Sequence, residues 1–256
     1  MAKPSRIVSL NLCTDQLLLL LADRSRIASL SFLARDRGLS YMADAAAGIP
    51  ANYGSAEEVL ALQPDLIVAG RYAAGPAIAL LRRLGFAVLD LPLADTMAEV
   101  RTQVRLLAAA IDESGRGERL LAGWDARLAA IHVGAGKTMP GAAIYQASGI
   151  VIGRNSLANE LLQTAGLRNL ATELGLPDSG YLPLEVLLSH PPDLLVLDDY
   201  RPDLPSLGEQ LLRHPALQAM AARRRTVAMP SRLWVCAGPG LAEAAERLAA
   251  AARQWP

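Results

Sequence analysis

Two cysteines near opposite ends of the chain are the residues with the most reactive chemistry. Cys13 follows a predicted strand over residues 6–10, and Cys236 follows the last predicted strand. The two thiols could form a disulfide in an oxidising compartment, hold a soft metal together, or stay as unrelated buried thiols. A Cα separation beyond about 7 Å would exclude the disulfide. Cys13 could also act as a nucleophile at a helix start, although no partner base can be named.

Arginine, tyrosine and polar residues next to predicted strand ends form the second group of candidates. Guanidinium groups pair with carboxylate or phenolate oxygens, and tyrosine and tryptophan offer a flat apolar face with a polar tip. Any one of them can equally be an ordinary surface or packing residue. The candidate ligand-binding residues are Asn11, Cys13, Thr14, Tyr53, Arg71, Tyr72, Arg154, Tyr181, Tyr200, Arg232, Trp234 and Cys236.

Known enzyme motifs are not matched. Residues 136–138, Gly-Lys-Thr, are similar to the end of a phosphate-binding loop, but Ile131 stands where that motif requires glycine. The histidines, His132, His190 and His214, share no metal-ligand spacing. We therefore expect no enzyme and no resident cofactor.

Composition narrows the class of protein further. The chain has 256 residues with 25 basic and 25 acidic side chains, so it lacks the basic footprint of a nucleic-acid binder. Its longest aliphatic run, residues 17–22, is too short to span a membrane. The first residues carry no secretory signal, which fits either a cytoplasmic protein or one whose signal has been removed.

Short β-branched runs alternate with helical patterns, which predicts parallel α/β sheets. Ser55 and Glu58 form a capping box, and the helix that they begin must end before Pro64. Residues 57–68 align without gaps onto residues 185–196, at a constant offset of 128 (185 minus 57). Because this spacing is half of the chain, we predict two similar lobes rather than a solenoid.

Helical periodicity from about residue 94 to 131, interrupted near Ser114-Gly115, predicts a long bridging helix between the lobes. The predicted division is an N-terminal α/β lobe over 1–94, a bridging helix over 95–133 and a C-terminal α/β lobe over 134–256. Ligands of open α/β sheets bind beyond the carboxyl ends of the strands, so two facing lobes would bind a ligand in the cleft between them.

Glu57 and Glu185 occupy equivalent positions in the repeat, each in the first turn of a predicted helix. The helix dipole alone favours a carboxylate there. Two exposed acids at equivalent positions could also form ion pairs with two basic sites on a symmetric partner, and salt would weaken this contact.

Together these features resemble the class III periplasmic substrate-binding proteins, which serve ABC importers of ferric siderophores, vitamin B12 and haem. The resemblance rests on residues 6–10, on Tyr53-Gly54 followed by residues 57–68, and on the second copy of that segment at residues 185–196. It implies two lobes joined by one rigid helix, with central, mostly parallel sheets flanked by helices. It also implies that Glu57 and Glu185 dock onto an ABC importer permease dimer.

The resemblance narrows the ligand to a metal chelate. The vitamin B12 binders of the family place several tryptophans in the cleft, whereas this chain offers Tyr53, Tyr72 and Tyr181, with only Trp234 near the last strand. A ferric siderophore is therefore expected ahead of cobalamin or haem. We expect a monomeric periplasmic protein; the alternatives are a cytoplasmic two-lobed enzyme using Cys13 and a module that binds no ligand.

Overall fold

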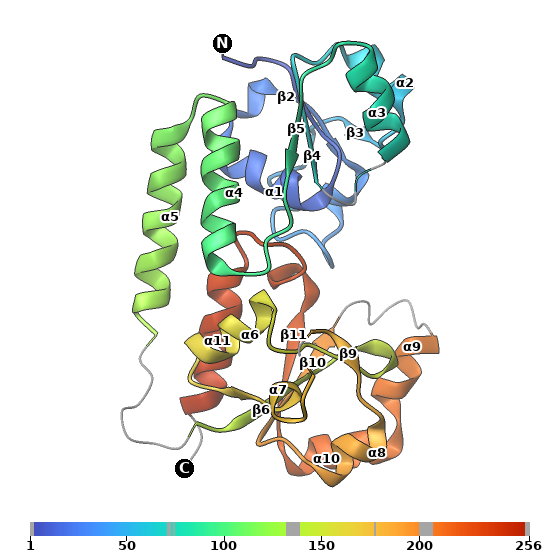
Figure 1. The fold of residues 1–256 in the computed structure, drawn as a ribbon, viewed down its shortest axis with the longest axis vertical. Helices are drawn as coiled ribbons and strands as arrows, with labels where there is room; N and C mark the ends of the chain where they lie inside the picture. The colour runs from blue at the N-terminus through green and yellow to red at the C-terminus, as the bar shows by residue number, and fades with distance from the viewer. Residues whose placement is uncertain are drawn as a thin grey trace. The chain divides into compact units, whose positions relative to one another are not determined.

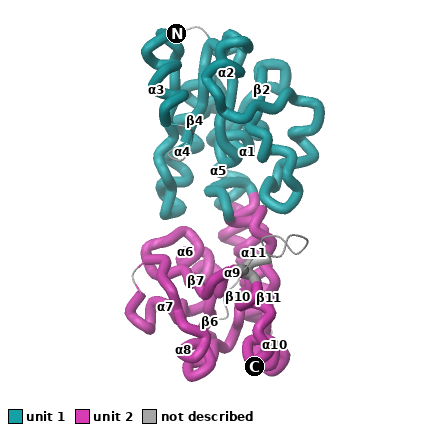
Figure 2. The backbone as a smooth tube through the Cα atoms, turned by 90° about the vertical axis from the view of Figure 1, so that its right-hand side faces the viewer, with its two compact units in different colours: residues 1–125, 235–239 teal, residues 126–234, 240–256 magenta. Residues whose placement is uncertain are grey.

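The computed structural model describes residues 3–70, 73, 75–131, 139–176, 178–199 and 207–253. The chain divides into two compact units (Figure 2). Unit 1 comprises Met1–Asp125 and Val235–Pro239, and unit 2 comprises Ala126–Trp234 and Gly240–Pro256. The division into lobes predicted from the sequence, with boundaries at residues 94 and 133, stays a prediction.

Unit 1 contains a five-stranded sheet in the order β3-β2-β1-β4-β5. Its strands are β1 (Ile7–Ser9), β2 (Ile27–Ser31), β3 (Ala51–Asn52), β4 (Leu66–Gly70) and β5 (Val88–Leu91). All four neighbouring pairs are parallel. The central strands β1 and β4 are buried on both faces, as the continuous apolar runs of a parallel sheet require. All five strands therefore end at one edge, which we call the unit 1 edge.

The helices of unit 1 follow the predicted local signals. They are α1 (Leu12–Leu21), α2 (Ala56–Leu62), α3 (Gly75–Arg83), α4 (Met97–Ala110) and α5 (Ser114–Ala129), with 3-10 turns η1 (Arg24–Arg26) and η2 (Phe32–Arg35). The capping box of Ser55 and Glu58 begins α2, and Gln63 ends it in a left-handed conformation directly before Pro64. These two predictions are confirmed.

The predicted single bridging helix is instead two helices, α4 and α5, which Figure 1 shows side by side. Asp112 adopts a left-handed φ of 57°, and the amide of Glu113 donates to the carbonyl of Ala108 at 2.7 Å, which closes the end of α4. A Cβ on Gly117 of α5 would lie 2.7 Å from the Ala108 Cβ, so the helices pack closely. The boundary between the two units falls inside α5.

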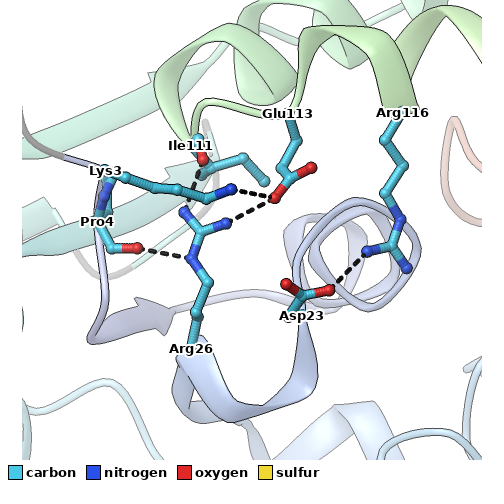
Figure 3. Close-up of polar contacts among 7 residues, drawn as sticks. All are labelled: Lys3, Pro4, Asp23, Arg26, Ile111, Glu113 and Arg116. Carbon is cyan, nitrogen blue, oxygen red and sulfur yellow. Dashed lines mark hydrogen bonds and ion pairs between the residues drawn. The ribbon is translucent and has the colours of Figure 1, made fainter.

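A polar network fastens the turn between α4 and α5 to the rest of unit 1 (Figure 3). Arg26 is only 9% exposed, and its guanidinium donates to the carbonyls of Pro4 and Ile111 at 2.7 and 2.6 Å and to Glu113 Oε1 at 2.9 Å. Lys3 Nζ lies 2.8 Å from the same carboxylate oxygen. The chain start, η1 and the helix turn are therefore joined through one buried cation.

Unit 2 contains a second sheet, in the order β11-β10-β6-β7-β9, with β8 pairing to β6. Its strands are β6 (Gly141–Tyr145), β7 (Ile150–Val151), β8 (Arg168–Asn169), β9 (Gly180–Tyr181), β10 (Leu194–Asp199) and β11 (Arg225–Pro230). The pairs of β10 with β11, β10 with β6, and β6 with β8 are parallel; β7 is antiparallel to β6 and β9.

Helices flank this second sheet. They are α6 (Leu157–Thr164), α7 (Leu170–Glu173), α8 (Leu184–Ser189), α9 (Leu207–Gln210), α10 (Pro215–Arg223) and α11 (Leu241–Arg253), with 3-10 turns η3 (Ala147–Gly149), η4 (Leu211–Arg213) and η5 (Ser231–Leu233). The consecutive elements α8 and β10 begin at the positions that the repeat predicts from α2 and β4. The predicted fold class, α/β with two mostly parallel sheets flanked by helices, is confirmed. Within the described ranges, no helix has both the length and the apolar character needed to cross a bilayer.

Candidate functional site

The first turn of α1 lies at the unit 1 edge and brings several predicted residues together. The Asn11 side chain caps the helix by accepting from the Thr14 amide at 2.9 Å, and the Thr14 hydroxyl hydrogen-bonds to Ser9 Oγ at 2.6 Å. A Cβ on Gly70, at the end of β4, would lie 2.2 Å from Asn11 Nδ2. Asn11 is half-buried and Thr14 is buried, so the structure uses both residues to build the edge.

The cysteines of the chain are joined in a disulfide. Cys13 in α1 and Cys236 have a Cα separation of 5.1 Å, within the bridging limit. Cys236 packs with the buried side chains of Leu12 and Leu39. The sequence left open a disulfide, a shared soft metal or two unrelated thiols, and the structure contains the disulfide.

The predictions that needed a free thiol at Cys13 or Cys236 are wrong for this structure. A soft-metal site and a nucleophile both require a thiolate, which a disulfide sulfur does not offer. Among the residues that the structure describes, no group of three or more histidine, cysteine, aspartate or glutamate side chains could hold a metal ion.

Two exposed aromatic rings stack at the ends of neighbouring strands. Phe32 follows β2 and Tyr53 follows β3; their ring centroids are 5.1 Å apart with planes inclined by 20°. Phe32 is 49% exposed and Tyr53 is 74% exposed. We call these two residues the aromatic pair. Tyr53 was predicted as a ligand-binding residue; Phe32 was not, although it also stands directly after a strand.

A buried carboxylate lies behind the aromatic pair. Asp15 of α1 has no exposed surface and accepts from the Ser31 amide at 3.1 Å and from the Ser31 hydroxyl at 2.5 Å. Burial raises the pKa of Asp15 to about 6, and the hydrogen bonds from Ser31 and Ser9 oppose this rise. Sequence reasoning missed Asp15, since its only signal is an acid inside an otherwise apolar helix.

The raised pKa of Asp15 predicts a distinctive dependence of stability on pH. The protonated form is favoured in the fold, so its contribution is fully present below pH 3.8 and is lost as pH rises through about 6. Between pH 4 and 7 we expect the free energy of unfolding to fall by up to about 3 kcal/mol relative to Asp15→Asn. Urea unfolding of both proteins across this range measures it, and parallel pH profiles would contradict it.

The unit 2 candidates occupy its strand ends and helix starts. Tyr181 ends β9 and is 66% exposed, and Glu185 is exposed in the first turn of α8, as Glu57 is in α2. Arg154 is exposed and Arg232 is half-buried, and neither forms an ion pair with a described residue.

Two further features mark the strand ends of unit 2. The indole Nε1 of Trp234 is buried without a hydrogen-bond partner in the described part of the chain. Ser148, after β6, has a left-handed φ of 59°.

The predicted residues Arg71, Tyr72 and Tyr200 lie outside the described residues.

These features define a two-unit α/β protein whose strand ends carry aromatic, arginine and polar side chains. A family model described as periplasmic binding protein matches residues 7–228, and the chain belongs to that family. The resemblance stated from the sequence is therefore confirmed. This family is made up of substrate-binding transport proteins.

Solved structures of similar fold support this assignment. The periplasmic haem-binding protein RhuT from Roseiflexus sp. RS-1, in apo form, is 25% identical over 96% of this chain and 98% of that one, with a TM-score of 0.77. Two Vibrio cholerae structures share the fold. Haem-binding HutB (TM-score 0.80) is 18% identical over 98% and 99% of the chains, and vitamin B12-binding BtuF (TM-score 0.67) is 17% identical over 98% and 97%. A search of curated proteins finds no match.

Proposed function

We propose that this protein is the periplasmic substrate-binding component of an ABC importer for an iron chelate with a flat aromatic face, with haem as the first candidate. The observation that carries the proposal is the aromatic pair. Phe32 and Tyr53 expose large apolar rings at the strand ends, where α/β sheets bind ligands. Such rings offer a planar ligand a stacking surface, and a tyrosine oxygen is a known axial ligand of haem iron.

The choice of haem departs from the siderophore expected from the sequence. Arg154 and Arg232 would suit an anionic siderophore and the propionates of haem equally well, so the arginines do not separate the two ligands. The stacked pair favours the planar chelate, and the relative at 25% identity is described as haem-binding. Ferric siderophore and cobalamin remain outcomes of the test.

The disulfide supports the periplasmic part of the proposal. Disulfides persist in oxidising compartments such as the periplasm and are rare in the cytosol. Cys13 and Cys236 are bonded in the structure, so the fold is suited to that compartment. We further propose that the protein acts as a monomer and delivers its ligand to a permease dimer.

The ligand is tested by titrating the purified protein with haemin, a ferric catecholate siderophore and cobalamin, while following absorbance and melting temperature. A ligand present at 100 times its Kd stabilises the fold by about 2.7 kcal/mol. We expect haemin to give a saturable change in the haem absorbance band and to raise the melting temperature. Binding of the siderophore alone would replace haem in the proposal, and binding of none of the three would contradict it.

Docking to the permease predicts that reversing Glu57 and Glu185 to lysine abolishes most ligand uptake while leaving ligand affinity unchanged. Both carboxylates are exposed at equivalent helix starts, where a charge reversal replaces attraction to basic sockets by repulsion. Uptake in cells carrying the importer measures the effect. Asp44→Lys, which reverses an acid in an exposed pair with Arg37, is the control. Equal uptake by the double variant and the control would refute the docking role.

A further inference from the structure

A cluster of buried polar side chains lies directly behind the aromatic pair. Its members come from α1 and from the three strands β1, β2 and β3, and all are buried: Ser9, Thr14, Asp15, Ser29, Ser31 and Asn52. We call this set the polar cluster. Elsewhere α1 buries Leu17, Leu18 and Leu21, so an apolar residue would also suit a buried position on this helix. A buried carboxylate at position 15 costs folding free energy. This cost indicates that its hydrogen bonds have a role other than stabilising the fold.

Asp15 holds the end of β2. Its two carboxylate oxygens accept from the amide and the hydroxyl of Ser31, the last residue of that strand. Phe32 is the next residue along the chain. Because Asp15 restrains both the backbone and the side chain of Ser31, it determines the direction in which the chain leaves the strand and therefore where the Phe32 ring lies.

Asn52 holds the end of β3 in the same way. Its Nδ2 lies 3.0 Å from the Ser9 carbonyl, 2.8 Å from Ser29 Oγ and 3.0 Å from the Leu30 carbonyl. The strand β3 pairs with β2 at only two residues, so these side-chain bonds reinforce a short edge strand. Tyr53 follows directly, and its amide donates to Glu58 Oε2 at 2.9 Å.

The two restraints meet at one register position. Ser31 and Asn52 are partners across β2 and β3, so Phe32 and Tyr53 leave the sheet side by side. We propose that Asp15 and Asn52 are positioning residues that hold the aromatic pair in its stacked geometry for a planar ligand. The ligand part of this inference rests on the proposed function.

Stability and ligand affinity should respond in opposite directions to Asp15→Asn. The substitution removes a buried charge, so it raises the free energy of unfolding at pH 7. It also replaces one acceptor oxygen by a donor, which loosens Ser31. We expect haemin affinity at pH 7 to fall about tenfold although the protein becomes more stable. A residue that served only the stability of the fold would not separate these two quantities.

The geometry of the aromatic pair can be followed without any ligand. The chain has two phenylalanines, so selective isotope labelling gives two sets of ring signals in NMR spectra. Phe86→Leu assigns them. In the wild-type protein we expect a shifted Phe32 ring signal and a nuclear Overhauser contact with Tyr53. Asp15→Asn and Asn52→Leu should move the Phe32 signal toward that of an unstacked ring.

Controls separate positioning from a general loss of stability. Val104→Ala removes buried methyl groups from α4 in the same unit without touching the polar cluster, so it should leave both the Phe32 signal and haemin affinity unchanged. Phe32→Ala gives the affinity expected when the pair is absent.

The possible results decide the two proposals separately. An unchanged Phe32 signal and unchanged affinity in both Asp15→Asn and Asn52→Leu would overturn the positioning role. A wild-type protein that binds none of the three chelates would overturn the proposed function, and the Phe32 signal would then still decide whether the polar cluster holds the pair.

Discussion

Replacing Cys13 and Cys236 together by alanine is expected to lower the free energy of unfolding by about 2–5 kcal/mol. The disulfide joins residues 223 positions apart, so it restricts the unfolded chain strongly. Alanine leaves no unpaired hydroxyl among Leu12 and Leu39, which pack against the bridge. Equilibrium unfolding in urea measures the change.

The reduced wild-type protein is the matched control for this prediction. A phosphine reductant breaks the same bond without changing the sequence, and it should produce a loss of similar size in the wild type and none in the alanine variant. The segment Val235–Pro239, which belongs to unit 1, should also lose protection from amide hydrogen exchange in both cases. Equal stability with and without the bridge would show that packing alone holds this segment.

Arg26→Met is expected to lower the free energy of unfolding by about 3 kcal/mol. The substitution leaves the carbonyls of Pro4 and Ile111 without their donor and removes the nearly buried partner of Glu113 (Figure 3). An unsatisfied buried acceptor such as the Ile111 carbonyl carries its full desolvation cost, which is why one substitution has a large effect. Thermal and urea unfolding measure it.

Two further variants identify the cause of the Arg26 effect. Arg116→Met breaks an ion pair with Asp23 that is largely exposed, so it should change stability by less than about 1 kcal/mol. The double variant Arg26→Met with Glu113→Leu should recover part of the loss, because the poorly exposed Glu113 carboxylate, which would lack its Arg26 partner, is then also removed, and the Lys3 ammonium that loses its partner is well exposed. If the double variant loses more free energy of unfolding than the two single variants lose together, this explanation is wrong.

Sequence reasoning succeeded where the physical signal is local. The capping box depends only on Ser55 and Glu58, and Pro64 disfavours helical geometry at the residue before it, Gln63. Both signals come from neighbours along the chain, so the bounds of α2 follow from them. The repeat with unit 2 follows as well, because α8 and β10 present the same pattern of residues as α2 and β4.

The features that sequence reasoning missed depend on contacts between distant residues. The sequence shows an interruption near Ser114-Gly115, but the separation into α4 and α5 requires Asp112 in a left-handed conformation, which is uncommon for a residue other than glycine and was not predicted. Asp15 gains its role only when folding places Ser31 beside it, 16 residues away. The choice among disulfide, metal site and free thiols could not be made without the distance between Cys13 and Cys236.

The account depends most on the claim that Phe32 and Tyr53 form the stacking surface for the ligand. The most direct test is a haemin titration of the wild-type protein beside the double variant Phe32→Ala with Tyr53→Ala, followed by absorbance. Tyr53 is largely exposed and Phe32 is half exposed, so the substitutions should leave the fold intact. We predict saturable one-to-one binding by the wild-type protein and affinity about ten- to a hundredfold weaker in the double variant, since two aromatic contacts are lost. Equal affinity in the two proteins would contradict the account.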